Sequence, residues 1–262
     1  MRNTVLKTLV LASILLFGTS KKVRAQVSLF DKNIYASKTG DSLPYRFFSP
    51  DYNTTNRKYP LVIFLHGSGE RGNNNEAQLK WGVMNFVSNE NMRLHPTYIL
   101  APQCPENLTW DNIELNGKNK EHKLAAKPSL PMKLLIELIK ECVQKYPIDT
   151  NRIYITGLSM GGYGTFDALE RYPNLFAAAV PVCGGGDTSK AKLFAHVPIW
   201  IFHGAEDGAV PTSHSQNMLK ALTDQGAYPG YTQFPEIGHF SWNAAYSNDL
   251  MMEWLFKQTK KP

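Results

Sequence analysis

The feature that most restricts the fold of this 262-residue chain is the alternation of short apolar runs with longer segments of helical periodicity. Parallel strands need long crossover connections, and helices usually supply them, so the alternation predicts an α/β fold with a mainly parallel sheet. Two runs near the start alternate apolar and polar residues and predict a leading antiparallel pair. The eight expected strands span 27–36, 43–48, 61–66, 97–101, 152–156, 177–183, 198–203 and 231–234.

Helices are expected between these strands, on both faces of the sheet. The clearest pattern begins at Pro131, where Leu134, Leu138 and Cys142 recur on one helical face. The expected helices span 76–87, 131–145, 160–172, 213–225 and 249–257.

Two connections between these elements bear on access to a site. The polar, charged stretch 112–127 is long for an ordinary connection, and we expect it to be a mobile surface loop. Only 14 residues separate Cys183 from Pro198, which leaves no room for a separate lid domain at that crossing.

The first 25 residues have the order of a secretory signal peptide. A short basic start is followed by an apolar run at 8–18 and by the small residue Ala25, so we expect cleavage after Ala25 and a single α/β domain over 26–262. The alternative is an uncleaved anchor, but the apolar run is shorter than the roughly 20 residues that span a bilayer. We therefore expect no membrane association after cleavage, in a secreted or periplasmic protein.

Removing this segment also removes most of the net charge. The whole chain carries +6, but residues 1–25 hold five basic residues and no acidic ones, which leaves 23 basic and 22 acidic residues. Without a basic patch or a known motif, nucleic-acid binding is not expected.

Export would expose the cysteines to an oxidising compartment. Cys104, Cys142 and Cys183 can form at most one pair, and the sequence does not choose among the three pairings. Buried free thiols are the simpler expectation, because such thiols behave as small apolar side chains.

The strongest chemical signal is the pentapeptide Gly157-Leu158-Ser159-Met160-Gly161, between an expected strand and an expected helix. A serine on such a tight turn projects its hydroxyl above the sheet, and only small neighbours allow the turn. The amide of Met160 then lies at the positive end of the helix, where it can stabilise an oxyanion. The pattern predicts a nucleophilic serine.

A serine hydroxyl needs a base, and the base needs an orienting acid. Of seven histidines, His239 lies in the loop after the last expected strand, and Asp207 follows the strand before it. The order Ser159, Asp207, His239 is that of hydrolases with this turn. Glu206 and Asp187 are rival acids.

The loop after the strand at 61–66 reads His66-Gly67-Ser68-Gly69-Glu70-Arg71-Gly72, and the Ser68 amide is the candidate second oxyanion donor. The loop also matches G-x-G-x-x-G, a pattern of dinucleotide sites. Three asparagines at 73–75 interrupt the helix that a pyrophosphate would need, which disfavours that alternative. No metal-ligand spacing is present, so we expect catalysis without a metal or cofactor.

Together these motifs resemble the α/β-hydrolase superfamily. Within it the chain is similar to the secreted esterases related to feruloyl and acetylxylan esterases and polyhydroxybutyrate depolymerases, and to a compact group often labelled predicted peptidases. The matching segments lie within about 43–256 and comprise 65–72, 101–105, 157–164, 203–211 and 238–242.

The resemblance implies a role for each candidate residue. Ser159 would be the nucleophile, His239 the base and Asp207 its orienting acid, with the Ser68 and Met160 amides as the oxyanion hole. Three further residues would line the substrate cleft: Gln103, Trp110 and Trp242.

The implied activity is hydrolysis of carboxylic esters through an acyl-enzyme, on a small ester or an acylated polysaccharide, by one α/β-hydrolase catalytic domain. Three alternatives stay open: a serine peptidase of the prolyl-oligopeptidase type, a polyester depolymerase, and an inactive hydrolase that binds polysaccharide. The sequence leaves the oligomeric state open.

Overall fold

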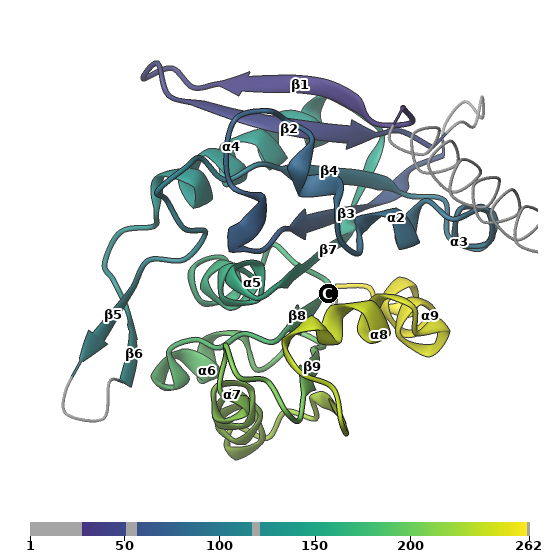
Figure 1. Ribbon diagram of the computed structural model, residues 1–262. Helices are drawn as coiled ribbons and strands as arrows, with labels where there is room; N and C mark the ends of the chain where they lie inside the picture. The colour runs from purple at the N-terminus through teal and green to yellow at the C-terminus, as the bar shows by residue number, and fades with distance from the viewer. Residues whose placement is uncertain (1–27, 51–56, 117–120, 261–262) are drawn as a thin grey trace, which may run out of the picture.

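The computed structural model describes residues 28–50, 57–116 and 121–260, and its centre is an eight-stranded sheet (Figure 1). Strand β2 runs antiparallel to both of its neighbours, and from β4 onward every neighbouring pair is parallel. The predicted α/β architecture with a leading antiparallel pair is therefore confirmed. In sheet order the strands are β1 (Asp31–Ala36), β2 (Ser42–Phe48), β4 (Tyr98–Pro102), β3 (Tyr59–Leu65), β7 (Ile148–Leu158), β8 (Ala178–Val182), β9 (Trp200–Gly204) and β10 (Gly230–Phe234).

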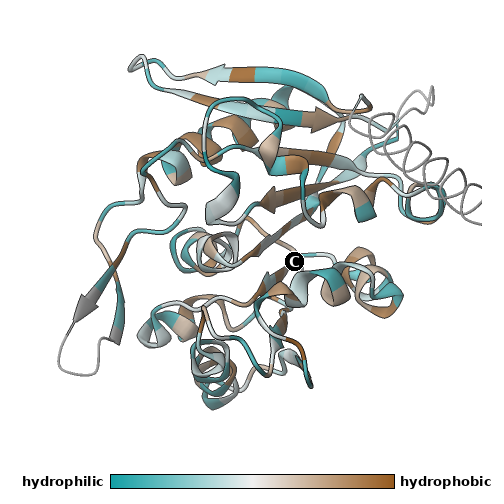
Figure 2. Ribbon diagram, in the orientation of Figure 1, coloured by the Kyte–Doolittle hydropathy of each residue, from teal (hydrophilic) through white to brown (hydrophobic). Residues whose placement is uncertain are grey.

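Helices cover both faces of the sheet, and each face has its own hydrophobic core. One core contains Phe166 and Met218 and lies under α4 (Leu130–Lys145), α5 (Met160–Arg171), α6 (Ala191–Phe194) and α7 (Thr212–Asp224). The other contains Val83 and Met251 and lies under α2 (Val83–Phe86), α3 (Asn89–Leu94), α8 (Trp242–Tyr246) and α9 (Asp249–Lys257). The central strands are the most hydrophobic part of the ribbon (Figure 2), and every residue of β3 is buried.

Local signals explain where the long helices begin. Ser129 caps α4 by accepting a hydrogen bond from the amide of Met132, and Pro131 occupies its first turn. Asn248 caps α9 by accepting from the amide of Met251. These helices agree with the predicted spans to within one residue.

The predicted helix over 76–87 is wrong. The segment forms a short turn, η2 (Ala77–Leu79), and then α2, with a break at Gly82. Gly82 has a φ of +74°, and a Cβ there would lie 2.4 Å from Cδ2 of Tyr246. The chain turns at this glycine because only glycine fits against the Tyr246 ring.

The stretch predicted to be a loop also differs. It contains an antiparallel hairpin of β5 (Ile113–Asn116) and β6 (Glu121–Leu124). The amides of Asn112 and Leu124 donate to the carboxylates of Asp167 and Asp187, so distant partners stabilise a segment whose own residues give little signal.

The crossover from β8 to β9 contains only η3 (Thr188–Lys190) and α6, so within the described residues no separate lid domain covers the sheet. The predicted signal peptide at 1–25 lies outside the residues that the structure describes. In the described part of the chain, no helix is both long enough and apolar enough to cross a membrane. All three cysteines are buried and free.

Candidate active site

Ser159 lies on a strained turn between β7 and α5. Its φ is +53° and its ψ −117°, a conformation that non-glycine residues rarely adopt. The Ser159 amide donates to the carbonyl of Val182 at 3.0 Å, and its carbonyl accepts from Gly162 at 2.8 Å. The surrounding backbone thus holds the strained conformation in place.

The two flanking glycines of the pentapeptide are required by close backbone contacts. A Cβ at Gly161 would lie 2.0 Å from the carbonyl oxygen of Leu65, and one at Gly157 would lie 2.3 Å from that of Gly161. The turn therefore packs directly against the end of β3, which brings Ser159 beside the loop that follows β3.

Three predicted residues meet at this turn. The Nε2 atom of His239 is 3.0 Å from Oγ of Ser159, and its Nδ1 is 2.8 Å from Oδ2 of Asp207. Because a carboxylate only accepts, Nδ1 carries the proton and Nε2 is free to accept the serine proton. Ser159 follows β7, Asp207 follows β9 and His239 follows β10, so all three side chains come from the carboxyl ends of strands.

Asp207 is held as a carboxylate. Burial raises the pKa of Asp207, but hydrogen bonds from His239 and from the amides of Val210 and Ala209 outweigh it and leave the pKa below its ordinary value. The two amides donate to Oδ1 at 2.8 and 2.9 Å. His203 is fully buried beside the carboxylate, with Nε2 3.3 Å from Oδ2 and 3.0 Å from the carbonyl oxygen of Val210.

The rival acids lie elsewhere. Glu206 is exposed, and the carboxylate of Asp187 accepts from the amides of Leu124 and Ser189, each at 3.0 Å. Of the three carboxylates, Asp207 is the one that reaches His239.

The two predicted oxyanion donors flank Ser159. Met160 is the first residue of α5, so its amide has no acceptor within the helix. Ser68 begins a single turn, η1 (Ser68–Glu70), and lines the same pocket as Ser159. Because η1 is three residues long and no helix follows at once, the loop lacks the helix N-terminus that a dinucleotide site needs.

A pocket of about 240 Å³ opens beside Ser159 and has an aromatic wall. The Trp242 ring lies 5.1 Å from that of His239, Phe240 lies 4.8 Å from Trp242, and Trp81 lies 5.8 Å from Phe240, all between ring centroids. The lining residues are Gly67, Ser68, Gly69, Glu70, Lys80, Trp81, Leu158, Ser159, His239, Phe240 and Trp242.

Trp242 was predicted to line this cleft, whereas Trp81, Phe240 and Lys80 were missed. Phe240 directly follows His239, and this position next to the predicted base could have indicated that Phe240 lines the pocket. Lys80 places Nζ 4.9 Å from the centroid of the Trp81 ring, a cation–π distance. No local sequence signal indicates that Trp81 reaches the site.

Gln103 and Trp110 do not line the pocket, which corrects the prediction for both. Each is fully buried. Gln103 accepts from the amide of Asn75 at 2.6 Å and donates to the carbonyl of Glu70 at 3.0 Å. Trp110 donates to the carbonyl of His66 at 3.1 Å. Both side chains brace the loop after β3 from behind, because their polar groups bond to its backbone.

One group of potential metal ligands occurs among the described residues: Cys183, Asp207 and His239. Burial raises the pKa of the Cys183 thiol to about 12, so it stays protonated at neutral pH. Asp207 and His239 are already bonded to each other. The donor set therefore suits proton transfer better than metal binding.

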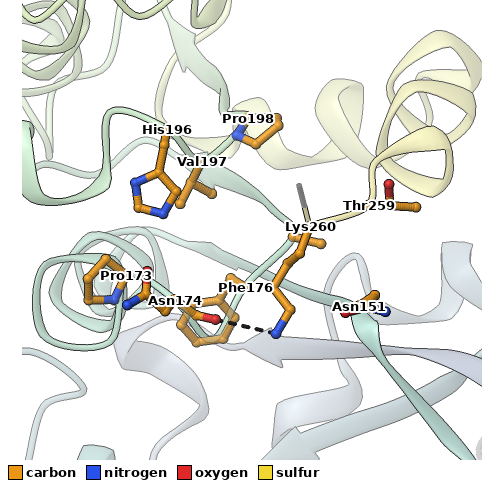
Figure 3. Close-up of a pocket in the computed structure, with 10 residues that line it drawn as sticks. Asn151, Pro173, Asn174, Phe176, His196, Val197, Pro198, Thr259 and Lys260 are labelled. Atoms are coloured by element: carbon orange, nitrogen blue, oxygen red, sulfur yellow. Dashed lines mark hydrogen bonds between the residues drawn. The ribbon is translucent and has the colours of Figure 1, made fainter. Parts of the chain in front are cut away.

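A larger cavity of about 370 Å³ lies at the opposite edge of the sheet (Figure 3). The cavity is lined by Pro173, Phe176, His196 and Pro198, among others. Lys260 also lines it, and its Nζ donates to the carbonyl of Asn174 at 3.3 Å. Its lining holds no nucleophile paired with a base, unlike the lining of the pocket beside Ser159.

Comparisons with known proteins agree with this fold. A solved structure described as a thermostable esterase is 39% identical, with a TM-score of 0.84, over 90% of this chain and 64% of that one. A bifunctional acetylxylan esterase/xylanase of Neocallimastix patriciarum is 25% identical over 74% of this chain and 26% of its own length. Poly(3-hydroxyalkanoate) depolymerase C of Paucimonas lemoignei is 28% identical over 68% of this chain and 47% of its own.

The chain thus spans less than half the length of these two relatives. The Phospholipase/Carboxylesterase family matches residues 52–248, most of the chain and all three residues that meet at the turn. The chain therefore belongs to the Phospholipase/Carboxylesterase family and is a hydrolase with the α/β-hydrolase fold.

Proposed function

We propose that this protein is a serine esterase that hydrolyses carboxylic esters through an acyl-enzyme on Ser159. The observation that carries the proposal is the continuous chain of contacts from Oγ of Ser159 through His239 to Asp207, on a strained turn beside an open pocket. Such a chain activates a hydroxyl that is otherwise a poor nucleophile.

The reaction follows from these positions. Oγ of Ser159 attacks the ester carbonyl carbon as its proton passes to Nε2 of His239. The carbonyl oxygen becomes an oxyanion between the amides of Met160 and Ser68. The carbon–oxygen bond to the alcohol breaks as His239 returns the proton to the leaving oxygen. Water, deprotonated by His239, then hydrolyses the acyl-enzyme and restores Ser159.

The proposed substrates are acetyl or feruloyl esters on a polysaccharide. The wall of Trp81, Phe240 and Trp242 supports a planar or apolar acyl group, since aromatic rings favour stacked or edge contacts. An open cleft suits acyl groups carried on a bulky polymer. The relative that acts on acetylxylan supports the same class. Export, proposed from residues 1–25, would bring the enzyme to such polymers.

The test is a panel of p-nitrophenyl acetate, p-nitrophenyl butyrate, methyl ferulate and a prolyl p-nitroanilide, with the Ser159→Ala variant beside the wild type. We expect ester turnover in the wild type and a loss of about 10⁴-fold or more in the variant, because the nucleophile is gone. Ser213→Ala, at an exposed serine of α7, is the matched control and should keep full turnover.

Two results would contradict the proposal. Cleavage of the anilide alone would make the protein a peptidase. Retention on polysaccharide without turnover of any compound would make it a binding protein.

A further inference from the structure

The β5–β6 hairpin has no part in the chemistry described so far. It is inserted between β4 and α4, so it leaves the sheet at the carboxyl edge, where Ser159 lies. In Figure 1 it extends from the body on the same side as α5, α6 and α7.

Buried charges anchor both ends of the hairpin. Asp167 is fully buried, accepts from the amide of Asn112 at 3.0 Å and pairs with Arg171 at 2.8 Å. Asp187 is buried, accepts from the amide of Leu124 at 3.0 Å and lies 3.5 Å from Nζ of Lys123. Because burying a carboxylate is costly unless it is well partnered, the hairpin and these acids stabilise each other's positions.

The anchored hairpin also packs a ring, that of His122, against the body of the protein. The ring of His122 packs edge-on against Tyr163 at 5.5 Å and against His214 at 4.6 Å between centroids. The Tyr163 hydroxyl and Nδ1 of His214 are 2.5 Å apart. The three rings come from β6, α5 and α7, and each is partly exposed.

This cluster lies close to the nucleophile. Tyr163 follows Ser159 by one helical turn, and its amide donates to the carbonyl of Ser159 at 3.1 Å. A Cβ on Gly185, just beyond β8, would lie 2.9 Å from Cβ of His214 and 3.4 Å from Cε1 of Tyr163. The cluster therefore sits at the carboxyl edge of the sheet.

The cluster and the aromatic pocket flank Ser159 from opposite faces of the sheet. The helices α5 and α7 pack on one face, through Phe166 and Met218. Trp81 and Trp242 pack on the other face. An ester has two arms on either side of its carbonyl carbon, and the cluster and the aromatic pocket belong to elements on opposite faces of the sheet around Ser159.

We propose that His122, Tyr163 and His214 form the subsite for the hydroxyl-rich alcohol arm of the ester, a sugar residue, while the aromatic pocket holds the acyl arm. This assignment rests on the proposed esterase function. A sugar offers hydroxyl groups and apolar C–H faces, and the cluster offers ring faces together with imidazole and phenol hydrogen-bonding groups at fixed positions.

The protonation state suits a neutral ligand. Burial lowers the pKa of His122, although Asp187 acts in the other direction, and burial lowers that of His214, reinforced by His122 and His203. Both rings are therefore uncharged near neutral pH and present donors and acceptors rather than a positive charge.

The experiment compares esters with one acyl group and different alcohols. The pairs are methyl ferulate with the feruloyl ester of arabinose, and ethyl acetate with monoacetylated xylobiose. The variants are His122→Ala and Tyr163→Phe. The second keeps the aromatic ring of Tyr163 and removes only its hydroxyl. We expect kcat/KM for the sugar ester, divided by kcat/KM for the simple ester, to fall about tenfold in each variant. His196→Ala, at an exposed histidine of the opposite edge, should leave this ratio at the wild-type value.

The outcomes separate the two proposals. A parallel fall for both esters, which leaves the ratio unchanged, shows a merely structural role and overturns the subsite. A wild-type enzyme that hydrolyses p-nitrophenyl acetate but no sugar ester also overturns the subsite and leaves the esterase function standing. Absence of any Ser159-dependent ester turnover overturns the esterase function itself.

Discussion

At the scale of single residues, the site depends on how Asp207 is held. Its side chain is fully buried, yet Oδ1 accepts two backbone amides and Oδ2 faces both His239 and His203. His239 and the two amides keep the carboxylate ionised and fix its direction, so it can hold the proton on Nδ1 of His239. In the proposed mechanism, the acid sets the tautomer and the orientation of the base.

Replacing Asp207 with asparagine tests this role. In Asp207→Asn the amide group can donate to Nδ1 and leave the proton on Nε2, where it blocks acceptance from Ser159. We expect kcat to fall by about 10³- to 10⁴-fold, somewhat less than in Ser159→Ala or His239→Ala. Steady-state hydrolysis of p-nitrophenyl acetate measures the fall. Glu206→Gln, one residue earlier and exposed, is the control; a larger loss there would show that the acid has been assigned wrongly.

At the scale of elements, the site depends on how closely β7, α5 and β3 approach one another. The pentapeptide turn brings Gly161 against the carbonyl of Leu65. Backbone atoms make this contact, so no side-chain rotation can relieve an added methyl group. The same contact sets the distance between Ser159 and the loop that follows β3, which holds the proposed oxyanion donor Ser68.

Gly161→Ala should therefore destabilise the protein by about 3 kcal/mol or more, at the upper end of the range for overpacked sites. The added Cβ would lie 2.0 Å from a backbone oxygen. Urea denaturation followed by tryptophan fluorescence gives the free energy of unfolding. At Gly208 a Cβ meets nothing within 4 Å, so Gly208→Ala should change stability by less than about 0.5 kcal/mol. Equal stabilities for the two variants would contradict the packing seen at the turn.

At the scale of the whole molecule, buried histidines make stability depend on pH. His66, at the end of β3, is 1% exposed and accepts from the amide of Cys104 at 2.9 Å. Burial lowers the pKa of His66 to about 4, with a smaller contribution from Arg71, although the hydrogen bond to the Gly67 carbonyl acts in the other direction. The unfolded chain therefore takes up this proton at a higher pH than the folded chain does.

The sign of the effect follows by linkage. The stability that neutral His66 contributes is present above pH 6.5 and is lost as the pH falls from 6.5 to about 4, a loss of about 3 kcal/mol. Denaturation of the wild type and of His66→Gln between pH 7 and pH 4 measures it, because other titrating groups are common to both proteins. We expect the wild type to lose about 3 kcal/mol more than the variant. Parallel curves would show that His66 is not buried as a neutral ring.

The sequence predicts those parts of the site that depend on near neighbours. Ser159 and His239 follow from short motifs next to strand ends, and the sheet follows from the order of apolar runs. The sequence does not show which way a side chain faces, so Gln103 and Trp110 were predicted at the cleft although they lie behind its loop. The hairpin was missed because its anchors, Asp167 and Asp187, are 55 and 63 residues away from the amides that they bind.

The insertion of the hairpin after β4 has a consequence for how such enzymes can diversify. The residues that meet at the turn follow β7, β9 and β10, whereas the hairpin follows β4 and is hydrogen-bonded to the body at Asn112 and Leu124. Evolution can therefore lengthen, shorten or exchange this segment while the strands that carry the reaction stay the same. On the proposed subsite assignment, a change in this one segment would alter substrate preference without a new catalytic apparatus.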